Sequence, residues 1–153
     1  MFNPYKAAKE QRDIVIFFRP LPEGLHGLYV FREQPLFIIN SLANQIEQRC
    51  ATTEELGHYF LGHRGNYFID NDYSEQIRIG KQEYDAKIWA ADRLIDTNRL
   101  IKLISQDHQF TPYDIADMFW VTLDVLFFKL QLLVNLGYLN NFFMPDITRY
   151  TDR

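Results

Sequence analysis

The first forty residues constrain the fold most, because they hold three short apolar runs of the kind that forms strands. The runs are residues 14–18 (IVIFF), 27–31 (GLYVF) and 36–39 (LFII), and prolines, glycines and charged residues separate them. Beyond Ser41 the apolar residues recur at helical spacing instead. Because strands come first and helices follow, we predict an α+β fold in which a small antiparallel three-stranded sheet packs on a helical core.

The helical part begins and ends at recognisable capping residues. The first helix is expected from the N-cap Ser41 to about Gly62, followed by a polar loop over residues 63–80 and a second helix over residues 81–95. The expected starts of the later helices are Asp96 or Thr97, Thr111 with Pro112, and Thr122, with the last helix ending at Gly137. We therefore predict two regions: residues 1–95 with the sheet, and residues 96–153, all helical and packed on the first.

Charge and cysteine usage narrow the classes of function and location. The net charge is −4, so nothing attracts the protein as a whole to nucleic acid or anionic lipid. Cys50 is the sole cysteine, which rules out an intramolecular disulfide and is typical of a reducing compartment. The N-terminus lacks an apolar signal-peptide core, and no run reaches the ~18 residues of a membrane span. We expect a cytoplasmic protein without membrane contact.

Residues 51–58, ATTEELGH, differ by one residue from the metallopeptidase pattern H-E-x-x-H. On a helix, Glu54 and His58 lie four apart and project from one face, with Glu55 beside both. In the full pattern the outer pair binds zinc and the inner glutamate acts as general base on water. A carboxylate can replace the first histidine because carboxylate oxygens also bind zinc. An ordinary exposed helix face could carry the same residues, so a further ligand is needed.

The second helix offers that ligand. Glu83 is followed by Ala86 and Ala90 three and seven residues later, on one stripe of a helix. The small residues would allow close approach to the first helix at Gly57, which otherwise weakens a helix by roughly 1 kcal/mol. This approach would bring the Glu83 carboxylate towards His58.

Three further histidines stand outside this set. His63 lies five residues after His58, about 140° around a regular helix, so it could join the site only if the helix unwound at Gly62. We expect it to support a ligand or to lie at the surface. His26 and His108 have no defined partner in the sequence and are expected to be structural or exposed.

Taken together, these segments resemble the ImmA/IrrE family of zinc metallopeptidases, small bacterial proteins often encoded beside helix-turn-helix repressors. PLPEGLHGLYV and LFIINSL resemble the family's strand region, TTEELGHYFLGH its H-E-x-G-H helix, and QEYDAKIWAADRLI its third-ligand helix. The resemblance implies a metallopeptidase-like helical core in which Glu55 is the general base and His58 and Glu83 are metal ligands. Glu54 occupies the first-histidine position, an E-E-x-G-H variant also read in some relatives from phages and mobile elements.

The resemblance implies a metal-dependent endopeptidase that cleaves a specific regulatory protein, such as a repressor encoded nearby. With two carboxylates and one histidine, a divalent ion is formally neutralised, so we expect weaker acidification of water and weaker preference for Zn²⁺ over Mn²⁺ or a related ion. The alternative is a weak or inactive family member that relieves repression by binding the repressor. The aromatic content, 16% of the chain, is also compatible with a homodimer.

The C-terminal region has the spacing of a helix-turn-helix, with Trp120 and Val121 at the turn. Residues 112–139 nevertheless hold three aspartates against Lys129 alone. This balance repels phosphate, so we expect no direct nucleic acid binding and interpret the region as a packing or protein-recognition element.

Overall fold

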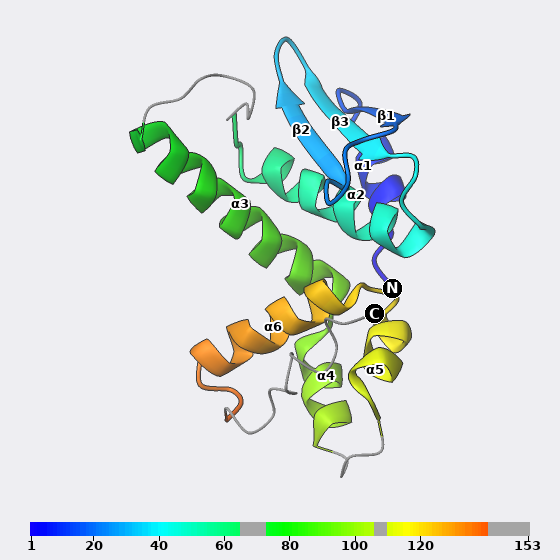
Figure 1. Cartoon of the computed structure of the whole chain (residues 1–153), viewed down its shortest axis with the longest axis vertical. Helices are drawn as coiled ribbons and strands as arrows, with labels where there is room; N and C mark the ends of the chain where they lie inside the picture. The colour runs from blue at the N-terminus through cyan, green and yellow to red at the C-terminus, as the bar shows by residue number, and fades with distance from the viewer. Residues whose placement is uncertain (65–72, 106–109, 141–153) are drawn as a thin grey trace. The chain divides into compact units, whose positions relative to one another are not determined.

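The computed structural model of the chain describes residues 1–64, 73–105 and 110–140, and its architecture is α+β, as predicted (Figure 1). The chain divides into two compact units, Met1–Leu94 and Ile95–Arg153. Within the described ranges, no helix is both long enough and apolar enough to cross a membrane. The first unit contains the sheet and three helices: α1 (Pro4–Glu10), β1 (Val15–Arg19), β2 (Gly27–Phe31), β3 (Pro35–Asn40), α2 (Gln45–Phe60) and α3 (Tyr73–Leu94).

The sheet is mixed, so the prediction of an antiparallel sheet was wrong for one strand. β3 lies in the middle; it pairs antiparallel with β2 through a tight turn but parallel with β1. The connection from β1 to β2 must therefore pass the end of β3. Asn40, the last residue of β3, holds this connection: its side chain accepts from the Leu21 amide at 3.2 Å and donates to the Leu25 carbonyl at 2.9 Å.

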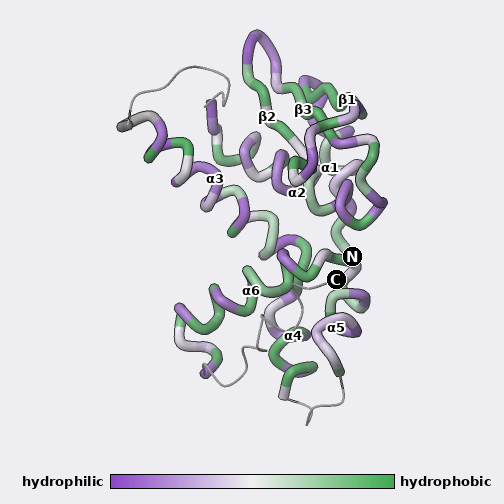
Figure 2. Tube along the Cα trace, in the orientation of Figure 1, coloured by the Kyte–Doolittle hydropathy of each residue, from purple (hydrophilic) through white to green (hydrophobic). Residues whose placement is uncertain are grey.

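Helix α2 lies between the sheet and α3, and it contacts β2, β3 and α3 (Figure 1). The strands consist largely of hydrophobic residues, whereas the β2–β3 turn is hydrophilic (Figure 2). The short helix α1, which was not predicted, also packs on α2; Asn3 caps it and Pro4 opens it. The core between these elements is formed by buried apolar side chains, namely Ala8, Tyr29, Phe37, Ile39, Ala51 and Leu56.

Two helix boundaries differ from the predictions. Helix α2 is capped by Asn44 rather than Ser41, because Asn44 and Glu47 form a reciprocal capping box that leaves Ser41 in the preceding turn. Helix α3 begins at Tyr73, so residues 73–80 are helical and were wrongly assigned to the loop. Buried Ile79 lies four residues before Glu83 and continues the same helical stripe, which polar neighbours obscured in the sequence.

The second unit contains α4 (Thr97–Ile104), α5 (Pro112–Phe119) and α6 (Leu123–Asn135). The predicted caps are confirmed: Asp96, Thr111 and Thr122 each accept from a backbone amide of the helix that follows. The turn between α5 and α6 places Trp120 in the left-handed region at a φ of 55°. Among the described residues of this unit, the buried side chains are apolar except for Lys129; they include Ile95, Leu100, Ile115, Phe119, Leu126, Leu130 and Leu133.

Candidate metal centre

Helix α2 buries an unusual number of polar side chains. Thr52 and Thr53 are fully buried, but each donates its hydroxyl to a carbonyl one turn back, at 2.7 and 2.8 Å. Buried Arg49 donates to the Phe2 carbonyl at 3.1 Å, which joins the helix to the N-terminal segment. Hydrogen bonds to backbone carbonyls therefore account for these three residues. Two further buried residues of this helix make different contacts: His58 meets Glu83 of α3, and Glu55 lies against Gly27 of β2.

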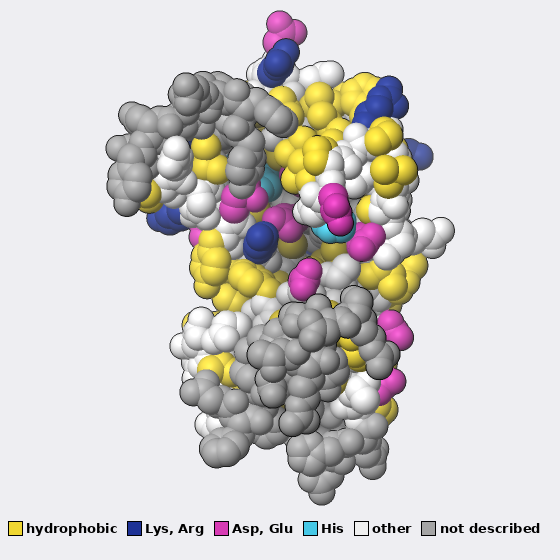
Figure 3. Space-filling model, viewed as in Figure 1, with side chains coloured by type: hydrophobic (Ala, Val, Ile, Leu, Met, Phe, Trp, Pro, Cys, Tyr) yellow, Lys and Arg dark blue, Asp and Glu magenta, His cyan; other side chains and the backbone are white. Residues whose placement is uncertain are grey.

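The structure brings Glu54, His58 and Glu83 together. Each residue offers one potential ligand atom, and these atoms lie within 4.8 Å of one another. The Nε2 atom of His58 is 3.1 Å from Oε1 of Glu83, so residues from two helices meet directly. Figure 3 shows histidine side chains next to acidic ones on one face of the molecule. The arrangement supplies two carboxylates and one imidazole that together could hold a metal ion.

The close approach of α2 and α3 depends on Gly57, as predicted. A Cβ atom at this position would lie 2.9 Å from the carbonyl oxygen and 3.2 Å from the Cα of Ala86. Those neighbours are backbone atoms of α3, so they could not move aside without moving the helix. The side of α3 that faces α2 carries small side chains, namely fully buried Ala86 and buried Ala90. Small residues on both helices therefore set the distance at which Glu83 meets His58.

Glu55 lies on the other side of α2, against the sheet. It is only 5% exposed, and a Cβ atom at Gly27 would lie 2.5 Å from its Oε1 atom. The bare backbone of β2 at Gly27 therefore makes room for this carboxylate. Burial, followed by the charges of Glu54 and Glu83, raises the pKa of Glu55 well above its ordinary value. Gly27 was not predicted as part of the site, because its contact with Glu55 joins a strand to a helix.

Electrostatics make this group of residues a suitable cation site. Burial raises the pKa of Glu54, and the nearby Glu83 raises it further, while Lys87 and His58 act in the opposite direction. Three carboxylates held this close repel one another, and a divalent cation among them would relieve both the repulsion and the cost of burial. The oxygen and imidazole donors suit Zn²⁺ or Mn²⁺. The residues present therefore fit a divalent metal ion.

Two rings contact the imidazole of His58, namely the phenol ring of Tyr29 and the imidazole of His63. The Tyr29 ring stacks on the His58 ring with centroids 5.7 Å apart and an interplanar angle of 11°. Burial raises the pKa of Tyr29 to about 12, so its phenol stays neutral. His63 is buried, and its Nδ1 atom lies 3.0 Å from Nδ1 of His58. Tyr29 was not foreseen from the sequence. His26 is exposed, and His108 lies outside the described residues.

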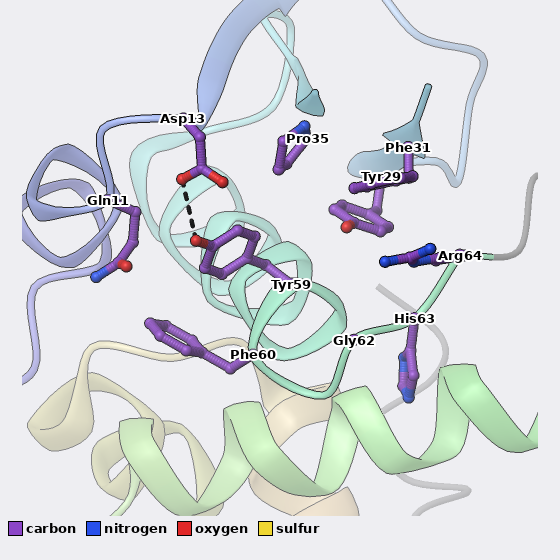
Figure 4. Close-up of a pocket in the computed structure, with 10 residues that line it drawn as sticks. All are labelled: Gln11, Asp13, Tyr29, Phe31, Pro35, Tyr59, Phe60, Gly62, His63 and Arg64. Carbon is purple, nitrogen blue, oxygen red and sulfur yellow. Dashed lines mark hydrogen bonds between the residues drawn. The ribbon is translucent and has the colours of Figure 1, made fainter. Parts of the chain in front are cut away.

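A pocket of about 420 Å³ lies beside Tyr29 and His63. Figure 4 shows Asp13 and Tyr59 on one side of it and Arg64 and His63 on the other, with the Tyr59 hydroxyl donating to Asp13 at 3.0 Å. Aromatic rings form much of the wall, and the lining residues are Gln11, Asp13, Tyr29, Phe31, Pro35, Tyr59, Phe60, Gly62, His63 and Arg64. The pocket thus combines apolar walls with one acidic and one basic group.

The chain is similar to a known protein family. Residues 9–131 match the model of the peptidase M78 family, described as the IrrE N-terminal-like domain. No curated protein matches the chain. Because the family model spans well over half of the sequence, including every residue of the cluster above, the chain belongs to the peptidase M78 family of IrrE N-terminal-like, metallopeptidase-type domains.

Proposed function

We propose that the protein is a metal-dependent endopeptidase that cleaves a specific regulatory protein, such as a helix-turn-helix repressor encoded nearby. The observation that carries the proposal is the meeting of Glu54, His58 and Glu83 within 4.8 Å, with buried Glu55 next to the first of them. Membership of the peptidase M78 family supports the same reaction class. The repressor substrate rests on the resemblance drawn from the sequence.

In this proposal Glu54, His58 and Glu83 hold Zn²⁺, with Mn²⁺ as a second candidate. When bound, the ion polarises the substrate carbonyl and makes water a better nucleophile. Glu54 supplies a carboxylate oxygen where H-E-x-x-H supplies an imidazole nitrogen. The extra negative charge stabilises binding of the cation but reduces its power as a Lewis acid. We therefore infer slow or highly selective hydrolysis.

Glu55 is assigned the role of general base. Its carboxylate accepts a proton from water as the water oxygen attacks the peptide carbonyl carbon, and it returns the proton to the leaving amine as the C–N bond breaks. Glu55 must be ionised to begin this cycle. Its surroundings alone favour the protonated form, so the proposed role requires a cation close by to restore the carboxylate.

The pocket beside the cluster is a suitable place for a substrate side chain. Tyr29 and His63 line it and also contact His58, so a side chain bound there would hold its own backbone close to the ligands. The walls of Phe31 and Phe60 favour an apolar side chain. Asp13 and Arg64 offer charges to neighbouring residues of the same peptide.

The alternative function is relief of repression by binding without cleavage. It is favoured by one specific observation, the carboxylate at position 54, because a neutralised site activates water poorly. The same pocket, with its aromatic walls, would then bind the partner without a reaction. The two functions differ in whether the repressor chain is cut.

The substitution Glu55→Gln separates the two functions. The purified protein, loaded with Zn²⁺, is incubated with the neighbouring repressor and with a proteome-derived peptide library, and cleavage is read by mass spectrometry. Glu55→Gln should lower the cleavage rate by about 10²–10⁴-fold while Zn²⁺ binding changes little, because only the base is removed. Glu33→Gln, in the turn between β2 and β3, is the matched control and should cleave at the parent rate.

Two results would contradict the enzymatic proposal. The first is a metal-to-protein ratio near zero after incubation of the parent protein with Zn²⁺. The second is a Glu55→Gln variant that relieves repression in cells as well as the parent does, which would favour the binding function.

A further inference from the structure

The C-terminal end of α2 returns the chain towards its own last turn. After the last helical residue, Phe60, Gly62 adopts a φ of 69°. The amide of Gly62 then donates to the Tyr59 carbonyl at 3.1 Å, and the amide of His63 donates to the His58 carbonyl at 2.9 Å. This pair of bonds is the Schellman motif. It places the backbone of His63 directly beside His58, which a continued helix could not do.

The side chains of the two histidines meet as well. Their Nδ1 atoms are 3.0 Å apart, and the ring centroids are 5.0 Å apart at an interplanar angle of 71°. Both rings are buried. The other nitrogen of His58, Nε2, faces Glu83 at 3.1 Å. The imidazole of His58 therefore directs its Nδ1 atom towards His63 and its Nε2 atom towards the carboxylate of Glu83.

We propose that His63 is a positioning residue that fixes His58 as a ligand through Nε2. Two neutral imidazoles can share a hydrogen bond between Nδ1 atoms only if one nitrogen carries a proton and the other does not. If His58 Nδ1 donates, its Nε2 is left with a lone pair that can bind a cation. If His63 Nδ1 donates instead, the proton of His58 sits on Nε2 and blocks binding. In this proposal His63 Nδ1 is the acceptor, and the pair selects the tautomer of His58 that binds metal.

This inference rests on the proposed metal site, and in it His63 acts through His58 rather than by contacting the metal itself. Three variants test it: His63→Ala removes the acceptor, His63→Gln replaces it with an amide oxygen, and Gly62→Ala disturbs the turn that delivers it. A Cβ atom at Gly62 would meet nothing within 4 Å, so this last change acts only through the left-handed backbone. His26→Ala, which removes an exposed histidine from the same unit, is the matched control.

The measurement is the dissociation constant for Zn²⁺, obtained by competition with a chromophoric chelator, together with the visible absorption spectrum of the Co²⁺-loaded protein. We expect His63→Ala to raise the dissociation constant by about 10–100-fold, the range typical of groups that orient a metal ligand. His63→Gln should recover part of the lost Zn²⁺ affinity. Gly62→Ala should lower the affinity less than His63→Ala does. His26→Ala should match the parent. The Co²⁺ spectrum should keep its intensity, because the ligands are unchanged.

Each contrary result has a distinct meaning. If the parent binds neither Zn²⁺ nor Co²⁺, the proposed metal-dependent function fails, and the role of His63 fails with it. If the parent binds and His63→Ala binds equally tightly, only the positioning role is wrong. A collapse of the Co²⁺ spectrum in both His63 variants would make His63 a ligand and overturn the inference. Thermal unfolding of the metal-free variants checks folding, and His63→Gln and Gly62→Ala decide the matter if His63→Ala does not fold.

Discussion

Helices α2 and α6 each bury part of their surface, but α2 buries many more polar side chains than α6. Helix α6 buries four leucines, and among its described residues Lys129 is the one buried charge. Helix α2 buries a glutamate, a histidine, an arginine and two threonines. Apolar burial stabilises a fold by about 1.5–3 kcal/mol per large side chain, whereas a buried carboxylate is costly unless it is paired. The difference indicates that α6 serves stability and that α2 carries function at some cost in stability.

The largest expected effect tests the functional side of this comparison. Glu83→Gln removes one of three potential ligands, so the dissociation constant for Zn²⁺ should rise by more than about 100-fold, beyond the loss expected for a merely supporting residue. The metal-free protein should be no less stable than the parent, because one of three neighbouring carboxylates has lost its charge. Chelator competition measures the first quantity and thermal unfolding the second. Unchanged affinity for Zn²⁺ would remove Glu83 from the site.

The next effect tests the stabilising side. Leu126→Ala, at a fully buried position of α6, should lower the free energy of unfolding of its unit by about 2–5 kcal/mol and leave Zn²⁺ affinity within a few-fold of the parent. The chain has two tryptophans, Trp89 in the first unit and Trp120 in the second, so single Trp→Phe backgrounds report each unit separately by fluorescence. A large loss of metal affinity in Leu126→Ala would contradict the assignment of α6 to stability.

The smallest effect concerns two glycines that differ only in their surroundings. Gly57→Ala should destabilise the first unit by about 1–3 kcal/mol and weaken metal binding, because the new methyl group pushes against the α3 backbone that carries Glu83. At Gly80, in α3, a Cβ atom would meet nothing within 4 Å. Gly80→Ala should therefore stabilise the unit by up to about 1 kcal/mol through helix propensity. Denaturant unfolding checks both signs, and equal effects at the two positions would contradict the close contact at Gly57.

Much of the fold follows from local patterns in the sequence. The α+β order, the three strands and the caps at Asp96, Thr111 and Thr122 were predicted because each depends on residues within one turn or one strand of each other. The parallel pairing of β1 was not predicted, because β1 pairs with β3, which is not the next strand along the chain. The start of α3 was missed for a similar reason: the buried position of Ile79 overrides a polar sequence.

The features of the candidate site also divide into those that local sequence patterns predict and those that depend on tertiary contacts. The sequence by itself indicated the chemical groups of the cluster: Glu54 and His58 lie four residues apart and so share a helix face, and Glu83 precedes small residues on one stripe of the next helix. Tertiary structure alone decided that Gly27 leaves room for Glu55 and that Tyr29 stacks on His58. It also decided that His63 returns to His58 through a left-handed glycine. These contacts join separate elements or reverse the chain direction, so periodicity within one helix cannot reveal them.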